Sequence, residues 1–299
     1  MKSPLRLGII GLSKGNGHPY SWSAIFNGYN AKMMETCGFP VIPRYLEEQT
    51  FPEAGLHEAR VTCIWTQDKD LSKHIAETCY IDTVVINPEE MIGKIDGLLL
   101  ARDDAENHYT MSKPFIEAGL PIYIDKPLAF SVNEAQKILD IQVYQGQIFT
   151  CSALKYAKEL EIDSLDLNNI SLIKGQVPKD WDKYAIHIIE PILKILNKRC
   201  ISLECVQGQV STHGSLRRLT MNLHQNLEIE ICATGQAGDN IFIEVFGDKN
   251  TYKLEFRNTF NAFRSALKDF CEGLKNKDTK VDIDFVLNSI KILEMGRSN

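Results

Sequence analysis

Six short apolar runs alternate with helix-like stretches through the first half of the 299-residue chain. Runs of this length suit buried strands, and most of the stretches between them repeat apolar residues at helical spacing. Strands that alternate with helices build a parallel sheet covered by helices on both faces. The expected strands are residues 5–11, 60–66, 83–86, 95–101, 122–124 and 147–151. We therefore predict an α/β fold whose first domain, residues 1–152, contains a doubly wound parallel sheet.

The alternation of strands and helices ends after about residue 152. A helix is expected over residues 182–197, and five strand-like runs follow it at residues 200–209, 216–223, 227–233, 240–246 and 251–256. Their short polar turns suit an antiparallel sheet. Two helices, at about residues 260–275 and 283–296, complete the pattern. We therefore expect residues 153–299 to form an α+β domain with a mostly antiparallel open sheet.

Composition excludes several classes of protein. The chain has 33 basic and 39 acidic residues, and neither sign forms a long block, which argues against binding to nucleic acid or to a membrane surface. No apolar run approaches the roughly 18 residues that a membrane helix needs, and the first residues resemble no signal peptide. The eight cysteines show no C-x-x-C pairing, so we expect reduced thiols, no metal site and a cytoplasmic location.

A glycine-rich loop follows the first expected strand and leads into a helix expected over residues 20–37. Strand, glycine loop and helix form the layout that places a pyrophosphate at a helix N-terminus. The pattern G-x-G-x-x-G is absent as written, because serine stands where the second glycine would be. A plain strand-to-helix turn is the alternative. If the loop binds a dinucleotide, the candidate contacts are Gly11, Ser13, Gly15, Asn16 and Gly17.

Polar residues follow several of the other expected strands. Lys126 follows the fifth strand in the sequence Asp125-Lys126-Pro127, and the proline cannot extend a central strand. Ligands of open α/β sheets bind beyond the carboxyl ends of the strands, so Lys126 is either a working amine in a cleft or an exposed lysine in a turn. Further candidates for cofactor contact at strand ends are Thr66, Asp68, Arg102, Asp103, His108 and Asp125.

The expected helix at 182–197 carries a polar stripe beside its apolar face. Lys183, His187, Glu190 and Lys194 recur at spacings of four, three and four, and Tyr184 lies about one turn before the histidine. A solvated stripe is one interpretation. The other is a general base at His187, with Glu190 close enough to favour its protonated form.

Taken together, these motifs resemble those of the glucose–fructose oxidoreductase and inositol dehydrogenase family, Gfo/Idh/MocA. The resemblance covers nearly the whole chain. Its ordered elements are the segments 8–11, 96–101 with His108 beyond, 117–121, 125–129 with Asp125-Lys126-Pro127 in place of Glu-Lys-Pro, and 185–191 with its His187-x-x-Glu190-Pro191.

The resemblance implies an oxidoreductase dependent on NAD or NADP, with an N-terminal Rossmann domain and a substrate that is a sugar, an inositol or a polyol derivative. Lys126 would orient the reacting hydroxyl or carbonyl group, and His187 would move the proton. Lys155 would contact the substrate from the segment after the sixth strand. The resemblance also implies a homodimer or homotetramer formed through the C-terminal sheet, with no nucleic acid and no membrane as partner.

Three positions depart from the family pattern. Lys183 stands where the family helix usually has an aspartate; Asp182 lies one residue away, and Tyr184 is an alternative acid or base. Thr66 stands where an acid usually holds the ribose hydroxyls, with Asp68 two residues later. Ser13 alters the glycine loop. An alternative function is therefore a dinucleotide-binding sensor or a structural subunit of the same fold that runs no redox chemistry.

Overall fold

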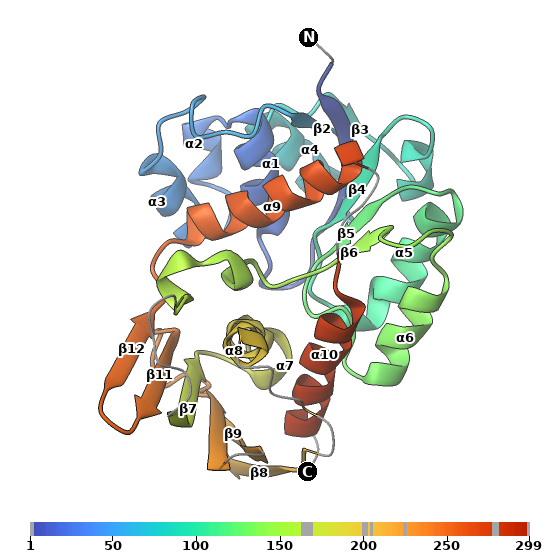
Figure 1. Cartoon of the computed structure of the whole chain (residues 1–299). Helices are drawn as coiled ribbons and strands as arrows, with labels where there is room; N and C mark the ends of the chain where they lie inside the picture. Colours follow the sequence, from blue (N-terminus) through green and yellow to red (C-terminus); the bar gives the residue numbers. More distant parts are fainter. Residues whose placement is uncertain are drawn as a thin grey trace. The chain divides into compact units, whose positions relative to one another are not determined.

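The structure is a computed structural model that consists of two compact units, and each unit is described by itself (Figure 1). The first unit contains residues 1–128, 136–150 and 263–281, and the second contains residues 129–135, 151–262 and 282–299. The residues that the structure describes are 3–162, 170–198, 203, 206–223, 226–276 and 281–297. The chain changes units at Thr150/Cys151, close to the expected boundary at 152/153. Neither unit is a single continuous stretch of the chain: residues 129–135 belong to the second unit, and residues 263–281 belong to the first.

The first unit is built on a six-stranded parallel sheet with the order β3-β2-β1-β4-β5-β6. This is the strand order of a dinucleotide-binding Rossmann sheet. The central strands are continuous apolar runs because helices cover both faces, and every residue of β4 is buried. The strands are β1 (Leu5–Ile10), β2 (Ala59–Trp65), β3 (Thr83–Val84), β4 (Gly97–Leu100), β5 (Ile122–Ile124) and β6 (Ile148–Phe149).

The α-helices that contribute to this unit are α1 (His18–Asn27), α2 (Ala31–Met34), α3 (Val41–Glu47), α4 (Lys69–Thr78), α5 (His108–Glu117), α6 (Val132–Asp140) and α9 (Thr259–Asn276); the 3-10 helices are η1 (Pro88–Met91) and η2 (Ala105–Asn107). The prediction of one helix over residues 20–37 was wrong. The first helix ends at Gly28, whose φ of +74° is a conformation that favours glycine. Asn30 then caps α2 by accepting a hydrogen bond from Met33 N.

The second unit contains a six-stranded sheet with the order β12-β11-β7-β10-β9-β8. Strands β7 and β10 pair in parallel, and the other neighbours pair antiparallel. The predicted fold class, a Rossmann-type parallel sheet followed by a mostly antiparallel one, is therefore confirmed. The strands are β7 (Ile170–Val177), β8 (Gly208–His213), β9 (Leu216–Leu223), β10 (Leu227–Ala233), β11 (Phe242–Gly247) and β12 (Thr251–Glu255).

Strand β7, at the centre of this sheet, was not predicted. Its sequence includes Lys174, Gly175 and Gln176, which weaken the apolar signal of a strand. The glycine allows close packing of helix α8 (Ile186–Lys198) on the sheet. A Cβ at Gly175 would lie 2.8 Å from Ile192 Cδ1 and 2.9 Å from Ile188 Cγ1. Of the expected strand at 200–209, residues 200–202, 204 and 205 lie outside the described residues.

The predicted helix at 182–197 is divided into α7 (Trp181–Tyr184) and α8. The other helices of the second unit are the short η3 (Ala153–Tyr156) and η4 (Lys158–Leu160) and the long α10 (Ile283–Arg297). Trp181 Nε1 donates a hydrogen bond to the Leu293 carbonyl (2.9 Å), which ties α7 to α10.

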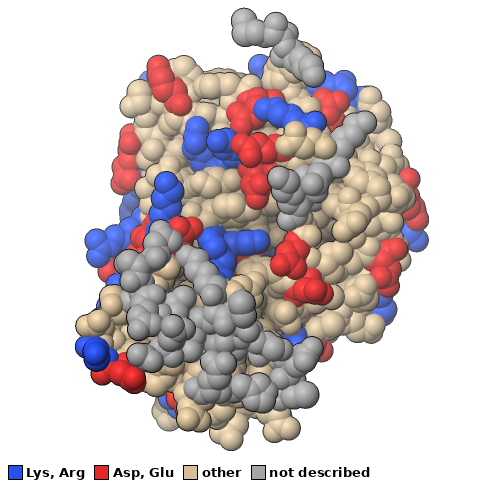
Figure 2. All heavy atoms as spheres, in the orientation of Figure 1, with Lys and Arg blue, Asp and Glu red and all other residues tan. Residues whose placement is uncertain are grey.

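Six cysteines lie among the described residues, all as free thiols, while Cys200 and Cys205 lie outside them. Within the described part of the chain, no helix is long and apolar enough to cross a membrane. Acidic and basic side chains lie interspersed on the face shown in Figure 2, in keeping with the mixed charge pattern of the sequence.

Candidate active site

Lys126 lies just beyond the carboxyl end of β5 and is buried, with 4% of its surface exposed. Its ammonium is 3.6 Å from Asp103 Oδ2, and Asp103 follows the neighbouring strand β4 and is 5% exposed. Adjacent parallel strands end at the same edge of the sheet, which brings the two side chains together. A buried lysine needs such a partner, because an unpaired charge in this environment is costly. Lys126 is therefore not an exposed turn lysine.

Ser13 connects the glycine-rich loop to this ion pair. Its hydroxyl donates to Asp103 Oδ1 (2.6 Å) and accepts from Asp103 N (3.1 Å). The serine that departs from the glycine pattern thus fixes the carboxylate that faces Lys126. The sequence suggested a direct cofactor contact at both Ser13 and Asp103, and the structure places the two in one hydrogen-bonded group.

Asp125 organises a second polar group at the same edge. Its Oδ2 accepts from Asn16 Nδ2 (2.8 Å) and lies 2.6 Å from His18 Nδ1, while its Oδ1 accepts from Lys126 N (2.8 Å). The His18 ring stacks on Trp22, with ring centroids 4.9 Å apart. Asn16 and Asp125, both predicted to contact a cofactor, therefore hold each other and fix the start of α1.

Arg102 lies between the loop after β1 and the end of β2. Its guanidinium donates to Asp104 Oδ1 (2.9 Å), Gln67 Oε1 (3.0 Å) and the Leu12 carbonyl (3.2 Å). Burial opposes the ionisation of Asp104, but hydrogen bonds from Arg102 and Asn107 outweigh it and hold the pKa of Asp104 below its ordinary value. Arg102 thus connects three strand ends within the first unit.

Thr66 and Asp68, the candidates at the end of β2, hold the start of α4. Thr66 N donates to Ser72 Oγ (2.9 Å), and Thr66 Oγ1 donates to the Asp68 carbonyl (2.6 Å). Asp68 Oδ1 accepts from Asp70 N (2.8 Å) and Leu71 N (3.2 Å) as the N-cap of α4. Both residues therefore position the first turn of α4.

Glycine is required at different positions of the loop for different structural reasons. A Cβ at Gly11 would lie 2.2 Å from Pro19 Cγ, and one at Gly17 would lie 2.5 Å from Ile42 Cδ1, so both permit close packing inside the unit. Gly15 has a φ of +83°, and within the described part of the chain no heavy atom lies within 4 Å of an added Cβ. Gly15 therefore exposes open backbone beside the start of α1.

His108 is the first residue of α5 and is fully buried. Its Nδ1 lies 3.0 Å from the Leu128 carbonyl oxygen, and its Nε2 lies 2.8 Å from the Arg102 carbonyl oxygen. We expected a cofactor contact from this residue. Its ring bridges two backbone segments, at Arg102 just before Asp103 and at Leu128 shortly after Lys126.

His187, in the second unit, lies on α8 and is 9% exposed. Its Nδ1 is 2.8 Å from Ser152 Oγ, and the Tyr184 ring packs edge-on against it with centroids 5.4 Å apart. Ser152 is fully buried, and its backbone N–H donates to Glu190 Oε2 (2.9 Å). We missed Ser152 in the sequence, although it follows the sixth strand as Lys126 follows the fifth.

Asp182, predicted as a catalytic residue, lies in an ion pair with Arg297, whose Nε is 3.0 Å from Asp182 Oδ1. Both side chains are more than a third exposed. The Tyr184 hydroxyl accepts a hydrogen bond from Lys179 Nζ. Of the predicted catalytic residues in this unit, the structure therefore brings Tyr184 to His187 and pairs Asp182 elsewhere.

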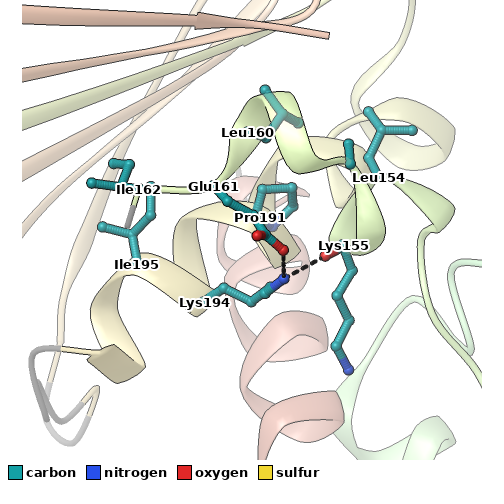
Figure 3. A pocket seen from close by; sticks show the side chains of 9 residues that line it. Leu154, Lys155, Leu160, Glu161, Ile162, Pro191, Lys194 and Ile195 are labelled. Carbon is teal, nitrogen blue, oxygen red and sulfur yellow. Dashed lines mark hydrogen bonds and ion pairs between the residues drawn. The ribbon is translucent and has the colours of Figure 1, made fainter. Parts of the chain in front are cut away.

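A narrow pocket in the second unit lies between α8 and the short helices after Ser152 (Figure 3). Lys194 donates there to Glu161 Oε1 (3.1 Å) and to the Lys155 carbonyl (2.7 Å). The Lys155 side chain points away from this pair, and its ammonium lies 4.4 Å from the centroid of the Phe285 ring. The pocket is lined mainly by apolar side chains, so we assign it no catalytic role.

Burial raises the pKa of Glu190 to about 7, although the charge of Lys155 and the hydrogen bond from Ser152 N act in the opposite direction. The folded state therefore binds a proton at this carboxyl more tightly than the unfolded state. Protonation of Glu190 therefore stabilises the folded state, and this stabilisation is fully present below the ordinary pKa of 4.5. It is lost as the pH rises toward 7.

We expect the Glu190→Gln variant to lose this pH dependence. The difference between 4.5 and about 7 corresponds to a contribution on the order of 3 kcal/mol. A glutamine keeps an acceptor for Ser152 N and carries no charge. Urea unfolding across this pH range should therefore give a flatter stability profile for the variant than for the wild type. Parallel profiles would contradict the assignment to Glu190.

The fold and the polar edge of the first sheet define the protein as a two-unit α/β protein with a Rossmann-type parallel sheet. A family model described as "Oxidoreductase family, NAD-binding Rossmann fold" (GFO_IDH_MocA) matches residues 37–152. Over this segment the chain matches the model of the family that its motifs resemble. The matched segment begins after the glycine-rich loop.

Several solved structures share the fold of this chain at low sequence identity. The chain is similar to a myo-inositol 2-dehydrogenase from Lactobacillus plantarum, with a TM-score of 0.73, 14% identity and coverage of 98% of this chain and 96% of that chain. A myo-inositol dehydrogenase from Lactobacillus casei in complex with NAD(H) and myo-inositol has a TM-score of 0.70, 12% identity and coverage of 98% and 94%. A putative oxidoreductase from Magnetospirillum magnetotacticum MS-1 has a TM-score of 0.71, 12% identity and coverage of 98% and 99%. A search of curated proteins found no match.

Proposed function

We propose that the protein transfers hydride between NAD or NADP and a CH–OH carbon of a sugar, inositol or polyol derivative. Lys126 carries the proposal, because it is a buried ammonium at the ligand-binding edge of the parallel sheet, paired with Asp103. An inositol as substrate is supported by the similar fold of the Lactobacillus casei enzyme in complex with NAD(H) and myo-inositol.

Hydride transfer from a CH–OH carbon requires two contributions from protein side chains. A hydroxyl must lose its proton as its carbon loses hydride, and the developing charge on oxygen must be stabilised. We assign the second task to the Lys126 ammonium and the proton transfer to His187, with Tyr184 beside it. A bound nicotinamide would supply the hydride acceptor.

The loop after β1 fits the diphosphate of a dinucleotide in two respects. Gly15 leaves open space around its backbone, and the first turn of α1 carries no acidic residue of its own, which suits an anion at a helix N-terminus. We propose that the segment 11–17 holds the diphosphate. The loop itself would be held in place by four polar residues beneath it, Arg102, Asp103, Asp125 and His108.

The end of β2 is less suited to the ribose of NAD. Thr66 Oγ1 and Asp68 Oδ1 are engaged in holding α4. Lys14 and Lys69 are near enough in sequence to pair with a phosphate, so both NAD and NADP stay within the proposal. A direct comparison of the two cofactors is therefore part of the test.

We expect NADH or NADPH to raise the melting temperature of the wild-type protein, since a ligand that binds only the folded state stabilises it by about 2.7 kcal/mol at one hundred times its Kd. The Gly15→Asp variant should lose this effect, because it adds a carboxylate to the proposed diphosphate site. Gly93→Asp is the matched control: Gly93 has a φ of +82° and equally open surroundings among the described residues. Equal stabilisation of both variants would contradict the assignment of the loop.

A dinucleotide-binding sensor or structural subunit is the second candidate. It is favoured by the engagement of Thr66 and Asp68 with α4 and by the pairing of Asp182 with Arg297 rather than with the histidine. Cofactor binding without turnover on any sugar or inositol would favour this candidate. A single substrate that gives turnover would exclude it.

A homodimer or homotetramer through the sheet of the second unit also stays a prediction. Cross-strand ion pairs lie on this sheet, with Arg218 Nη1 3.6 Å from Glu230 Oε2 and Lys253 Nζ 3.7 Å from Glu244 Oε1. A polar sheet face of this kind is compatible with a homodimer and with a homotetramer.

A further inference from the structure

We propose that His18 is a ligand-contacting residue whose Nε2 forms a hydrogen bond with a hydroxyl group of the bound cofactor or substrate. Asp125 holds the imidazole by its other nitrogen. The identity of the ligand rests on the proposed function, since a dinucleotide brings ribose hydroxyls and a sugar or an inositol brings ring hydroxyls. All the residues that carry the inference lie in the first unit.

The partners of Asp125 assign a proton to Nδ1 of His18. Asp125 is 1% exposed, Asn16 Nδ2 donates to its Oδ2 (2.8 Å), and Lys126 N donates to its Oδ1 (2.8 Å). Both oxygens of this carboxyl group therefore act as acceptors. His18 Nδ1 lies 2.6 Å from Oδ2, so it is the third donor to the same group. The assignment holds for a neutral ring and for a ring that carries both protons.

Nε2 of His18 is the nitrogen that remains for a ligand. Among the residues that the structure describes, the hydrogen bonds of His18 use only its backbone atoms and Nδ1. The buried side-chain nitrogens and oxygens without a partner in this part of the chain are Trp22 Nε1 and Ser23 Oγ. Nε2 is therefore not sealed in the core, and 16% of the His18 side chain is exposed.

Two aromatic rings fix the direction in which Nε2 points. The Trp22 ring stacks on the imidazole with centroids 4.9 Å apart and an interplanar angle of 14°, and the Phe263 ring packs edge-on against it at 4.9 Å. A donor to Asp125 alone does not require an imidazole, because an asparagine supplies one as well. The imidazole adds a second polar atom, and its surroundings hold that atom in place.

The position of His18 and the chemistry of its ring indicate a hydroxyl group as the partner. Asp125 directly follows β5 and precedes Lys126, so the pair lies at the edge where open α/β sheets bind their ligands. A hydroxyl both donates and accepts, and it therefore suits Nε2 with or without a proton. A phosphate oxygen suits only the protonated nitrogen. The proposed cofactor and substrate both carry several hydroxyl groups.

Two substitutions of His18 separate the ligand contact from the hold on Asp125. Asparagine places an amide N–H near the position of Nδ1 and leaves no atom at Nε2, whereas the amide of glutamine reaches the position of Nε2. We expect His18→Asn to keep the melting temperature of the ligand-free protein and to bind the ligand about tenfold more weakly, as one hydrogen bond is lost. His18→Gln should instead lower the melting temperature and retain more of the affinity.

The affinities are measured by calorimetry with NADH, with NADPH, and with myo-inositol in the presence of the cofactor. Weaker cofactor binding by His18→Asn would assign the hydroxyl to a ribose, and weaker myo-inositol binding at unchanged cofactor affinity would assign it to the substrate. Unchanged affinity in every arm would overturn the inference. The matched control is His57→Asn, because His57 is an exposed histidine of the same unit. An equal loss of affinity in this control would also overturn it.

A test on the wild-type protein avoids any effect of the variants on folding. In protein labelled with ¹⁵N-histidine, we expect a proton on Nδ1 of His18 and a shift of its Nε2 signal when the ligand binds. A ring protonated on Nε2 alone, or an Nε2 signal that no bound probe moves, would contradict the assignment. A shift without turnover would support the contact and remove the proposed redox function, and turnover without a shift would do the reverse. No binding of any probe would overturn both.

Discussion

Replacement of Lys126 by methionine is expected to lower kcat by about 10²–10³-fold, the usual effect of removing a group that stabilises developing charge. Methionine keeps much of the side-chain volume and removes the ammonium. The melting temperature should still rise with NADH or NADPH, because the proposed diphosphate contacts lie in the loop 11–17. Lys113→Met is the matched control: its ammonium pairs with Glu117 at 3.7 Å on the surface of α5, and it should retain wild-type kcat.

A double variant distinguishes the effect of Lys126 on turnover from its effect on the free energy of unfolding. Lys126→Met alone leaves the buried Asp103 without this cation, which is expected to cost on the order of 3 kcal/mol. The double variant Lys126→Met/Asp103→Asn should recover much of the lost free energy of unfolding but none of the turnover. Turnover in either variant close to that of the wild type would remove Lys126 from the mechanism.

Replacement of His187 by glutamine is expected to lower kcat by about 10²–10⁴-fold, because the reaction would lose its proton acceptor. The pH profile should lose the ionisation that the wild type owes to this residue. Ser152→Ala should reduce kcat less, since Ser152 Oγ lies 2.8 Å from His187 Nδ1 and only orients the ring. The measurement is kcat against pH for the three proteins.

The matched control for this series is His213→Gln, because His213 is an exposed histidine of the same unit. It should leave both kcat and its pH profile unchanged. An unaltered pH profile in His187→Gln would show that another group moves the proton, and Tyr184 would then be the next residue to replace.

The parallel sheet was predictable because its signal is local. Each central strand is a short apolar run, and Gly97–Leu100 is buried along its whole length. Strand β7 was not predictable in this way, because Lys174 and Gln176 interrupt its apolar pattern and its partners β10 and β11 lie much later in the chain. The break after α1 depended on a single glycine, Gly28, that a helical pattern tolerates.

The candidate site was predictable at the ends of strands and less so in its pairings. The position of Lys126 followed from the strand that precedes it, but its partnership with Asp103 depends on two strands lying side by side. Asp182 pairs with Arg297, 115 positions away, so no spacing in the sequence reveals that it is engaged. Ser152 stood at a strand end, yet its contact with His187 depends on how α8 packs.

The most direct test of the central proposal is an absorbance assay for reduced nicotinamide with NAD and NADP against a panel of inositols, sugars and polyols. We predict substrate-dependent reduction of one cofactor by the wild-type protein and its loss in Lys126→Met, with cofactor binding retained in both. Cofactor binding by the wild type with no reduction on any member of the panel would contradict the proposal and favour the non-catalytic alternative.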